Sequence, residues 1–218
     1  MELSEIRASL EQADFQYRLK AVQALQDYPS EVAVPILLEQ LGDREFLVRT
    51  FIAMALGKHQ GDRSFQALLE VMKFDDTPSV RAEAANSISL FGRVAISHLV
   101  AAFIQDSHWL VRRSVLAAIA DMESPIELLE ICLEGLNGDD LPVQEACIEA
   151  MGHLYDSPQR STVMERLIEL ADAESWRTRR QVALALRQFG HPRSIATLQR
   201  LRQDPDHRVI AAALEDLM

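Results

Sequence analysis

The 218-residue sequence lacks the features of a membrane protein, an exported protein or a disulfide scaffold. Its longest apolar run, VAVPILL at 32–38, is far shorter than the roughly 20 residues of a membrane-spanning helix. The charged N-terminus, MELSEIRASLEQ, contains no apolar export signal, so we expect a cytoplasmic location. Only two cysteines occur, Cys132 and Cys147. Because both lie among apolar residues, we expect buried free thiols.

Basic charge and catalytic motifs are also scarce. The chain has three lysines and a formal net charge of −11 at pH 7, which argues against general nucleic-acid binding because phosphate contacts need a basic surface. It has no glycine-rich phosphate loop, no G-x-S-x-G and no C-x-x-C. Glu145, Glu149 and His153 share a helical face with metal-ligand chemistry, but a solvated row explains them too. We therefore predict no catalytic residue and no metal, and the balance favours a non-enzyme.

What the sequence does contain is a repeat. DREFLVRTFIAMALG at 43–57 and DSHWLVRRSVLAAIA at 106–120 both have an acid, an aromatic residue three places before an arginine, Val-Arg and an apolar tail. The arginine of this motif, or the residue in its place, recurs every 31–35 residues at seven anchor positions: Arg18, Arg49, Arg81, Arg112, Gln144, Arg179 and Ile210. A period of this length indicates stacked structural repeats.

Each repeat has the period of two helices. Between 94 and 104 the apolar residues follow the i, i+3, i+4, i+7 spacing of an amphipathic helix, and Gly57, Gly92 and Gly190 stand where helices are expected to stop. We predict first helices near 3–12, 32–41, 63–73, 93–105, 125–135, 158–171 and 192–202. We predict second helices near 16–27, 46–57, 78–91, 109–122, 141–154, 175–189 and 206–217.

Fourteen helices in seven antiparallel pairs predict an all-α, right-handed α-solenoid, because a single pair cannot bury its apolar stripe alone. We expect one domain over 1–218, built from seven hairpins. Its units lie near 1–28, 29–58, 59–92, 93–123, 124–155, 156–190 and 191–218. The apolar end of the last helix, RVIAAALEDLM, suggests homodimer formation through the C-terminal edge.

The repeat resembles the HEAT-like repeats of the phycobilin lyase family, which have an armadillo-like fold. The likeness covers the whole chain. It depends on Asp106, Trp109, Val111 and Arg112, on Asp43, Val48 and Arg49 with Ala55-Leu56-Gly57, and on Asp76, Val80 and Arg81 with Ala84-Ala85. This resemblance implies a role with phycobiliproteins or their bilin chromophore. In such chemistry the client protein supplies the cysteine to which the bilin is attached.

The repeated acids and arginines predict a structural ladder. An aspartate in the turn can cap the second helix, and the arginine in the first turn of that helix can bridge its own aspartate and the next one. We assign this role to Asp43, Arg49, Asp76, Arg81, Asp106, Arg112, Asp172 and Arg179. Arg112 is expected to be buried and paired.

Partner contacts are expected on the second helices, where the residue one place after each anchor varies from repeat to repeat. The aromatic residues three places before the anchors either cover the turns or meet a partner, and both interpretations remain open. Arginine is concentrated near the C-terminus, with eight between 177 and 208 against two acids. The candidate partner-binding residues are Phe51, Met54, Trp109, Arg113, Trp176, Arg177, Arg180, Leu184 and Arg187.

Three functions fit these observations. The first is a non-catalytic or weakly catalytic binding scaffold for a protein client, in particular a phycobiliprotein subunit, in phycobilisome assembly or breakdown. The second is a component of a bilin lyase that attaches or detaches the chromophore, with bilin held non-covalently. The third is a general protein interaction module. No other cofactor and no nucleic-acid partner are expected.

Overall fold

The computed structural model describes residues 1–214. Over this range it contains fourteen α-helices and no β-strand, which confirms the predicted all-α fold. The first helices are α1 (Leu3–Leu10), α3 (Ser30–Glu39), α5 (Asp62–Phe74), α7 (Ile96–Gln105), α9 (Pro125–Leu136), α11 (Arg160–Leu170) and α13 (Pro192–Leu201). The second helices are α2 (Phe15–Leu25), α4 (Phe46–Lys58), α6 (Pro78–Ser89), α8 (Trp109–Asp121), α10 (Leu141–Gly152), α12 (Trp176–Leu186) and α14 (His207–Leu214). Three 3-10 turns complete the order: η1 (Gly92–Ala95), η2 (His153–Asp156) and η3 (Arg187–Phe189).

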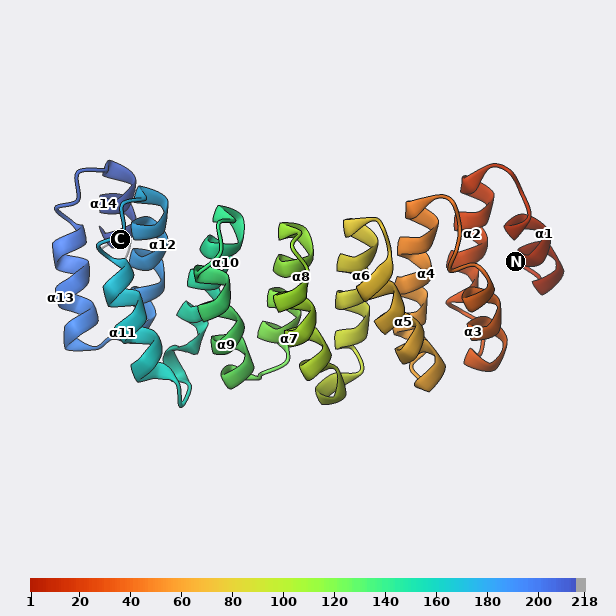
Figure 1. Ribbon diagram of the computed structural model, residues 1–218, viewed down its shortest axis with the longest axis horizontal. Helices are drawn as coiled ribbons and strands as arrows, with labels where there is room; N and C mark the ends of the chain where they lie inside the picture. Colours follow the sequence, from red (N-terminus) through yellow and green to blue (C-terminus); the bar gives the residue numbers. More distant parts are fainter. Residues whose placement is uncertain (215–218) are drawn as a thin grey trace. The chain divides into compact units, whose positions relative to one another are not determined.

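The helices divide between two compact units, residues 1–118 and the residues from Ile119 onward, so the boundary falls inside α8. In the first unit α2 packs on α4 and α4 on α6, while α3 packs against α5 and α5 against α7. In the second unit α10 packs on α12, α12 on α14, and α11 on α13. Each unit is therefore a row of helical hairpins in two layers, as Figure 1 shows for α2, α4 and α6. Neighbouring hairpins bury the apolar faces that one hairpin leaves open.

The apolar period of the sequence places the core between these two layers. Val48, Ile52 and Leu56 follow each other at intervals of four residues on α4, and all three are fully buried. Leu37 of α3 and Leu68 of α5 are also fully buried. Burial of each such side chain contributes about 1.5–3 kcal/mol relative to exposure. The core thus stabilises both the hairpins and their stacking.

Local sequence signals account for several helix ends. The side chain of Asp14 accepts a hydrogen bond from the N–H of Gln16 and so caps α2. Proline stands at the start of α6, α9 and α13, where its missing N–H costs no hydrogen bond. Gly92 and Gly190 have φ values of +73° and +54°, a left-handed conformation that favours glycine. Both follow the end of a helical segment, as expected.

Gly57 is the last but one residue of α4, so the helix stops where expected, but Gly57 lacks the left-handed conformation of Gly92 and Gly190. It is buried inside α4, and a Cβ at this position would lie 2.8 Å from the Cβ of Ser87 on α6. In the second unit a Cβ on Gly152 of α10 would lie 3.1 Å from the Cβ of Ala185 on α12. Both glycines stand eight residues after their anchors. They mark a recurring point of close approach between second helices.

The observed helix bounds lie within three residues of the predicted ones, apart from the last helix. That helix was predicted to run to 217, and its final residues, together with part of the proposed C-terminal dimer edge, lie outside the described residues.

We expect Gly57→Ala to lower the free energy of unfolding by roughly 1–3 kcal/mol, because the new methyl group overpacks the contact with Ser87. Urea unfolding followed by circular dichroism measures the change. Gly42→Ala is the matched control, since a Cβ there meets nothing within 4 Å. Equal midpoints for the two variants would contradict a close approach at Gly57.

Candidate functional site

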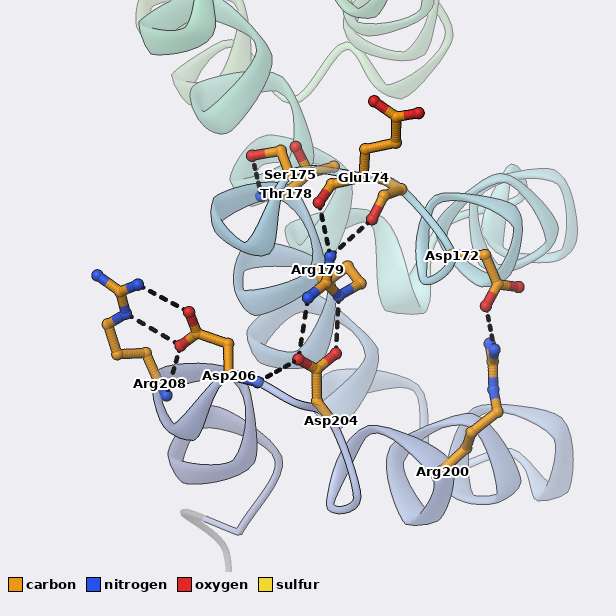
Figure 2. Close-up of polar contacts among 10 residues, drawn as sticks. Asp172, Glu174, Ser175, Thr178, Arg179, Arg200, Asp204, Asp206 and Arg208 are labelled. Carbon is orange, nitrogen blue, oxygen red and sulfur yellow. Dashed lines mark hydrogen bonds and ion pairs between the residues drawn. The ribbon is translucent and has the colours of Figure 1, made fainter.

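An ion-pair ladder links successive hairpins inside each unit. Four anchor arginines donate from Nε and Nη2 to the two oxygens of an aspartate in the following hairpin, at 2.6–2.7 Å and 2.9–3.1 Å respectively. The pairs are Arg18–Asp43, Arg49–Asp75, Arg81–Asp106 and Arg179–Asp204. Figure 2 shows the last of them. All eight side chains are largely buried, which makes these pairs structural rather than solvated.

The same side chains also satisfy backbone groups at the turns. Arg49 Nη1 donates to the backbone oxygen of Asp43, six residues earlier, at 2.8 Å. The Asp43 carboxylate accepts from the backbone N–H of Glu45, the N-cap residue of α4, at 2.8 Å. Equivalent bonds recur at the other pairs. Each pair therefore joins two hairpins and also closes a turn.

These contacts shift the pKa values of the paired groups. Hydrogen bonds from Arg179 lower the pKa of Asp204 below its ordinary value, against the opposing effect of burial. For Asp43 and Asp75 burial is the largest influence and raises the pKa, but hydrogen bonds from arginine and from a backbone N–H outweigh it, so both pKa values are lowered. The carboxylates are thus held in the charged form that the arginines need.

Two of the predicted ladder aspartates differ from the prediction: Asp76 is only an outer partner of its arginine, and Asp172 is not part of the ladder. Asp75, not Asp76, takes both bonds from Arg49, while the side chain of Asp76 is 88% exposed and adds one outer contact to that arginine. Asp172 pairs with Arg200, and both side chains are exposed (Figure 2). The ladder aspartates all stand three residues before a second helix and six before an anchor. This spacing selects Asp75 and excludes Asp172, which is seven residues before its anchor.

Arg112 also departs from the prediction, because it forms no ion pair with the residues of the first unit. Its guanidinium carbon lies 4.6 Å from the centre of the Phe103 ring, and its Nε is buried without a hydrogen-bond partner. The expected burial of part of this side chain is observed, but the expected pairing is not.

The exposed side of α4 carries large apolar side chains. Phe46 and Leu47 are 42% and 39% exposed. Phe51 and Met54, both predicted partner contacts, are half-buried on the same side of the helix with Thr50. We call these five residues the α4 face. The opposite side of α4 forms part of the core, so the helix is apolar on both sides. An apolar helix face left uncovered is typical of a surface that meets a partner.

In the second unit the exposed side of α12 is basic. Arg177 and Arg180 are exposed and Leu184 is half-buried beside them, and we call these three residues the α12 face. Trp176 is half-buried, with the guanidinium carbons of Arg208 and Arg177 at 3.2 Å and 4.7 Å from its ring centre. These cation–π contacts occupy the ring, so Trp176 covers the turn more than it offers a free surface. Predicted contact Arg187 is half-buried in η3.

Trp109 is the more open of the two tryptophans. It is the first residue of α8 and is 40% exposed, with His108 stacked beside it at 5.9 Å between ring centres. Arg113, one turn further along α8, is exposed, and its guanidinium carbon lies 5.9 Å from the Trp109 ring centre. These two predicted contact residues therefore present one aromatic and basic surface. The contacts of Trp176 favour the turn-covering interpretation for that residue, while the exposure of Trp109 leaves a partner contact as a prediction.

Sequence reasoning missed a cleft of about 620 Å³ between α5 and α7 in the first unit. Its lining includes Lys73, Phe74 and His98, and Phe74 is 65% exposed. The volume lies in the range of small-molecule sites. Its lining combines residues of the first helices α5 and α7 with the ladder pair Arg81 and Asp106, and no motif of the sequence predicts that these residues enclose a cleft.

The described residues bring together no recognisable catalytic group. Across 1–214 no group of three His, Cys, Asp or Glu side chains is placed to hold a metal ion. Cys132 and Cys147 are buried and free, as predicted, and a hydrogen bond between the two thiols, together with burial, raises the pKa of Cys132. A thiol with a raised pKa is a poor nucleophile. No helix over this range has the length and apolar character to cross a membrane.

The chain belongs to the HEAT repeat family, whose model matches residues 3–89 and 129–218. This confirms the predicted repeat class and the solenoid fold class. The comparison with curated proteins gives no match.

Solved structures show the same fold at low sequence identity. The Escherichia coli protein YibA aligns with a TM-score of 0.66 and 18% identity, over 97% of this chain and 80% of YibA. The complex of CpcE and CpcF of phycocyanin lyase from Nostoc sp. PCC7120 aligns with a TM-score of 0.53 and 20% identity, over 100% of this chain and 87% of that one. Pds5, from its complex with Scc1, has a TM-score of 0.68 and 15% identity, over 97% and 38%. At these identities the likeness is one of fold.

We expect Arg81→Ala to cost roughly 3–5 kcal/mol of unfolding free energy, because it leaves the buried Asp106 carboxylate without its partner. Arg112→Ala, at the same helix position, leaves no carboxylate of the first unit unpaired and loses a ring contact worth about 2 kcal/mol or less. Urea midpoints of the two variants are the measurement. A loss at Arg112 as large as that at Arg81 would show that Arg112 has a buried partner.

The Arg179–Asp204 pair predicts a loss of stability in acid. Because the folded-state pKa of Asp204 lies below its unfolded value, the unfolded chain binds the extra proton, and the free energy of unfolding falls as the pH drops below about 4. Asp204→Asn should lower stability at neutral pH and flatten this acid dependence. Glu165→Gln, which removes an exposed pair with Arg193, is the control and should leave the acid dependence unchanged.

Proposed function

We propose that the chain is a HEAT-repeat scaffold that binds a protein client through the exposed sides of its second helices and contributes no catalytic residue. The α4 face carries this proposal. Phe46 and Leu47 stay exposed on a helix whose other side is fully packed, and exposed apolar clusters of this kind mark interaction surfaces. The repeat conserves the side chains that stack hairpins, while the exposed positions differ from one second helix to the next.

Charge supports a second contact surface on the client. The α12 face presents Arg177 and Arg180 together with Leu184. Guanidinium groups pair with carboxylates through two hydrogen bonds and also stack on aromatic rings. A client with an apolar patch and an acidic patch would satisfy both faces. The α12 contact should weaken as salt rises, because exposed ion pairs are screened, whereas the apolar contact should not.

A phycobiliprotein is the client class that the resemblance favours. The Asp–Trp–Val–Arg motif at Asp106–Arg112 supports it, as does the likeness of fold to the phycocyanin lyase complex of Nostoc. In this proposal the chain holds a phycobiliprotein subunit during phycobilisome assembly or breakdown, and the chemistry at the bilin is left to other groups.

A second candidate function is a bilin lyase component, and the cleft between α5 and α7 is the observation that favours it. Its volume of about 620 Å³ suits a small organic ligand. Lys73 and His98 in its lining can meet the propionate groups of a tetrapyrrole, and Phe74 offers a ring for stacking. In this case the chain would bind free bilin as well as its protein acceptor.

A mixing experiment tests both functions. The chain is incubated with phycocyanin and, separately, with phycocyanobilin and apo-phycocyanin, and covalent chromophore is measured by absorbance and by zinc fluorescence on denaturing gels. We expect co-elution with phycocyanin and no change in covalent chromophore. A gain or loss of covalent bilin would establish the lyase instead. Absence of co-elution would reject the phycobiliprotein client and leave a scaffold for another protein.

Surface variants test the binding faces in the same assay. Phe46→Asp with Leu47→Glu should weaken client binding by at least about tenfold, because two carboxylates replace the apolar contact. Arg177→Glu with Arg180→Glu should weaken it most at low salt. Ile126→Glu is the matched control, since Ile126 is 64% exposed on the first helix α9. Equal loss in the control would contradict a site on the second helices.

A further inference from the structure

A second cavity of the first unit, of about 280 Å³, lies between the N-terminal parts of α3 and α5. Its lining includes Ser30, Glu31 and Pro35 of α3, His59 just after α4, and residues 60–64, which lead into α5. The volume is below the roughly 300–1,000 Å³ of sites for drug-sized ligands, so the cavity suits a molecule of few atoms.

The N-terminus of α5 has no side-chain cap. Its first helical hydrogen bond runs from the N–H of Phe65 to the backbone oxygen of Gly61, so the N–H groups of residues 62–64 have no acceptor within the helix. Gly61 is the N-cap residue and has no side chain that could accept them. These donors, together with the positive end of the dipole of a 13-residue helix, favour an anionic group in the cavity.

Ser64 gives an independent indication of a ligand. It lines the cavity and is only 1% exposed, and its Oγ has no hydrogen-bond partner among residues 1–214. Ser194 has the same place in α13, since each serine is third in its helix and follows an arginine. Ser194 Oγ accepts from the N–H of His191 at 3.1 Å and donates to the His191 oxygen at 2.8 Å. Ser64 lacks this internal solution, and a buried hydroxyl without a partner is costly.

The α3 side of the cavity offers acceptors instead of donors. Pro35 has no N–H, so the carbonyl of Glu31, four residues earlier, lacks its usual helical donor. The side chains of Glu31 and Asp62 add two exposed carboxylates to the lining, and Arg63 adds an exposed guanidinium. The cavity therefore combines groups that attract an anion with groups that attract a cation.

We propose that this cavity binds the zwitterion of a small α-amino acid. The carboxylate accepts from the N–H groups at the start of α5 and from the hydroxyl of Ser64, and Arg63 adds an attractive charge. The ammonium group donates to the carbonyl and the carboxylate of Glu31. A simple anion would be repelled by Glu31 and Asp62, and a simple cation by the helix dipole, whereas a zwitterion satisfies both sides. The site lies on first helices and does not depend on the proposed client.

The test uses the full chain and L-alanine as the probe, followed through backbone amide signals by ¹H–¹⁵N NMR. We expect the amide signals of residues 61–64 to shift saturably. N-acetyl-L-alanine lacks the ammonium group and L-alaninamide lacks the carboxylate, so each should bind at least about tenfold more weakly. Absence of a saturable shift, or equal binding of either analogue, would overturn the proposal.

Two serine variants separate binding from stability. Ser64→Ala should weaken L-alanine binding about tenfold without lowering the melting temperature, because its hydroxyl has no internal partner. Ser194→Ala should lower the melting temperature, because it loses the capping box, and should leave binding unchanged. A fall in melting temperature as large for Ser64→Ala as for Ser194→Ala would show an internal partner for the Ser64 hydroxyl and overturn the proposal.

Charge variants test the ammonium contact. Glu31→Gln should weaken L-alanine binding, whereas Arg93→Gln, at an exposed arginine of η1, should bind as the parent does. Unchanged binding in Glu31→Gln or in Ser64→Ala would contradict the proposed contacts.

Discussion

The structure depends on one contact, the bidentate ion pair between an anchor arginine and the aspartate of the following hairpin. Apolar packing between helices tolerates sliding and rotation, because Leu, Ile and Ala fit many neighbours. A planar guanidinium on a planar carboxylate does not, since Nε and Nη2 must meet two oxygens at once, as Arg18 and Asp43 do at 2.6 Å and 2.9 Å. A buried pair adds little net stability over an apolar one, and its main contribution here is to fix the register of stacking.

The same contact also joins local and long-range structure. The aspartate that receives the arginine also accepts the N–H of the residue before its own helix, so a turn closes where two hairpins meet. A change at one arginine therefore affects both hairpins. The two steps without this aspartate, at Gly138 and Ala173, follow the place in the sequence where the chain passes from one compact unit to the other. Their turns rely on other contacts, such as the amide of Gln144.

The sequence was sufficient to predict features that recur in every repeat. It was insufficient to predict contacts that belong to a single repeat. Helix bounds, the ladder and the buried thiols followed from periods that many positions share. The errors arose where a one-residue offset decides the contact. Asp75 and Asp76 are adjacent and chemically identical, and only the spacing of six to Arg81 separates them. Gly57 was correctly placed near the end of α4, but its close approach to α6 could not be predicted because it depends on Ser87, a residue of another repeat.

The binding surface is harder to predict because its residues make few contacts with the rest of the chain. A period of apolar residues predicts the buried side of α4, but the apolar residues on its other side have no internal partner to give them a pattern. The same reasoning applies to Arg112, whose motif matches those of its paired neighbours. Only the contacts show that no carboxylate of the first unit pairs with it. In a protein of stacked hairpins, departures from the shared contacts are therefore the informative positions: where the scaffold leaves an apolar face uncovered, a partner can supply the missing surface.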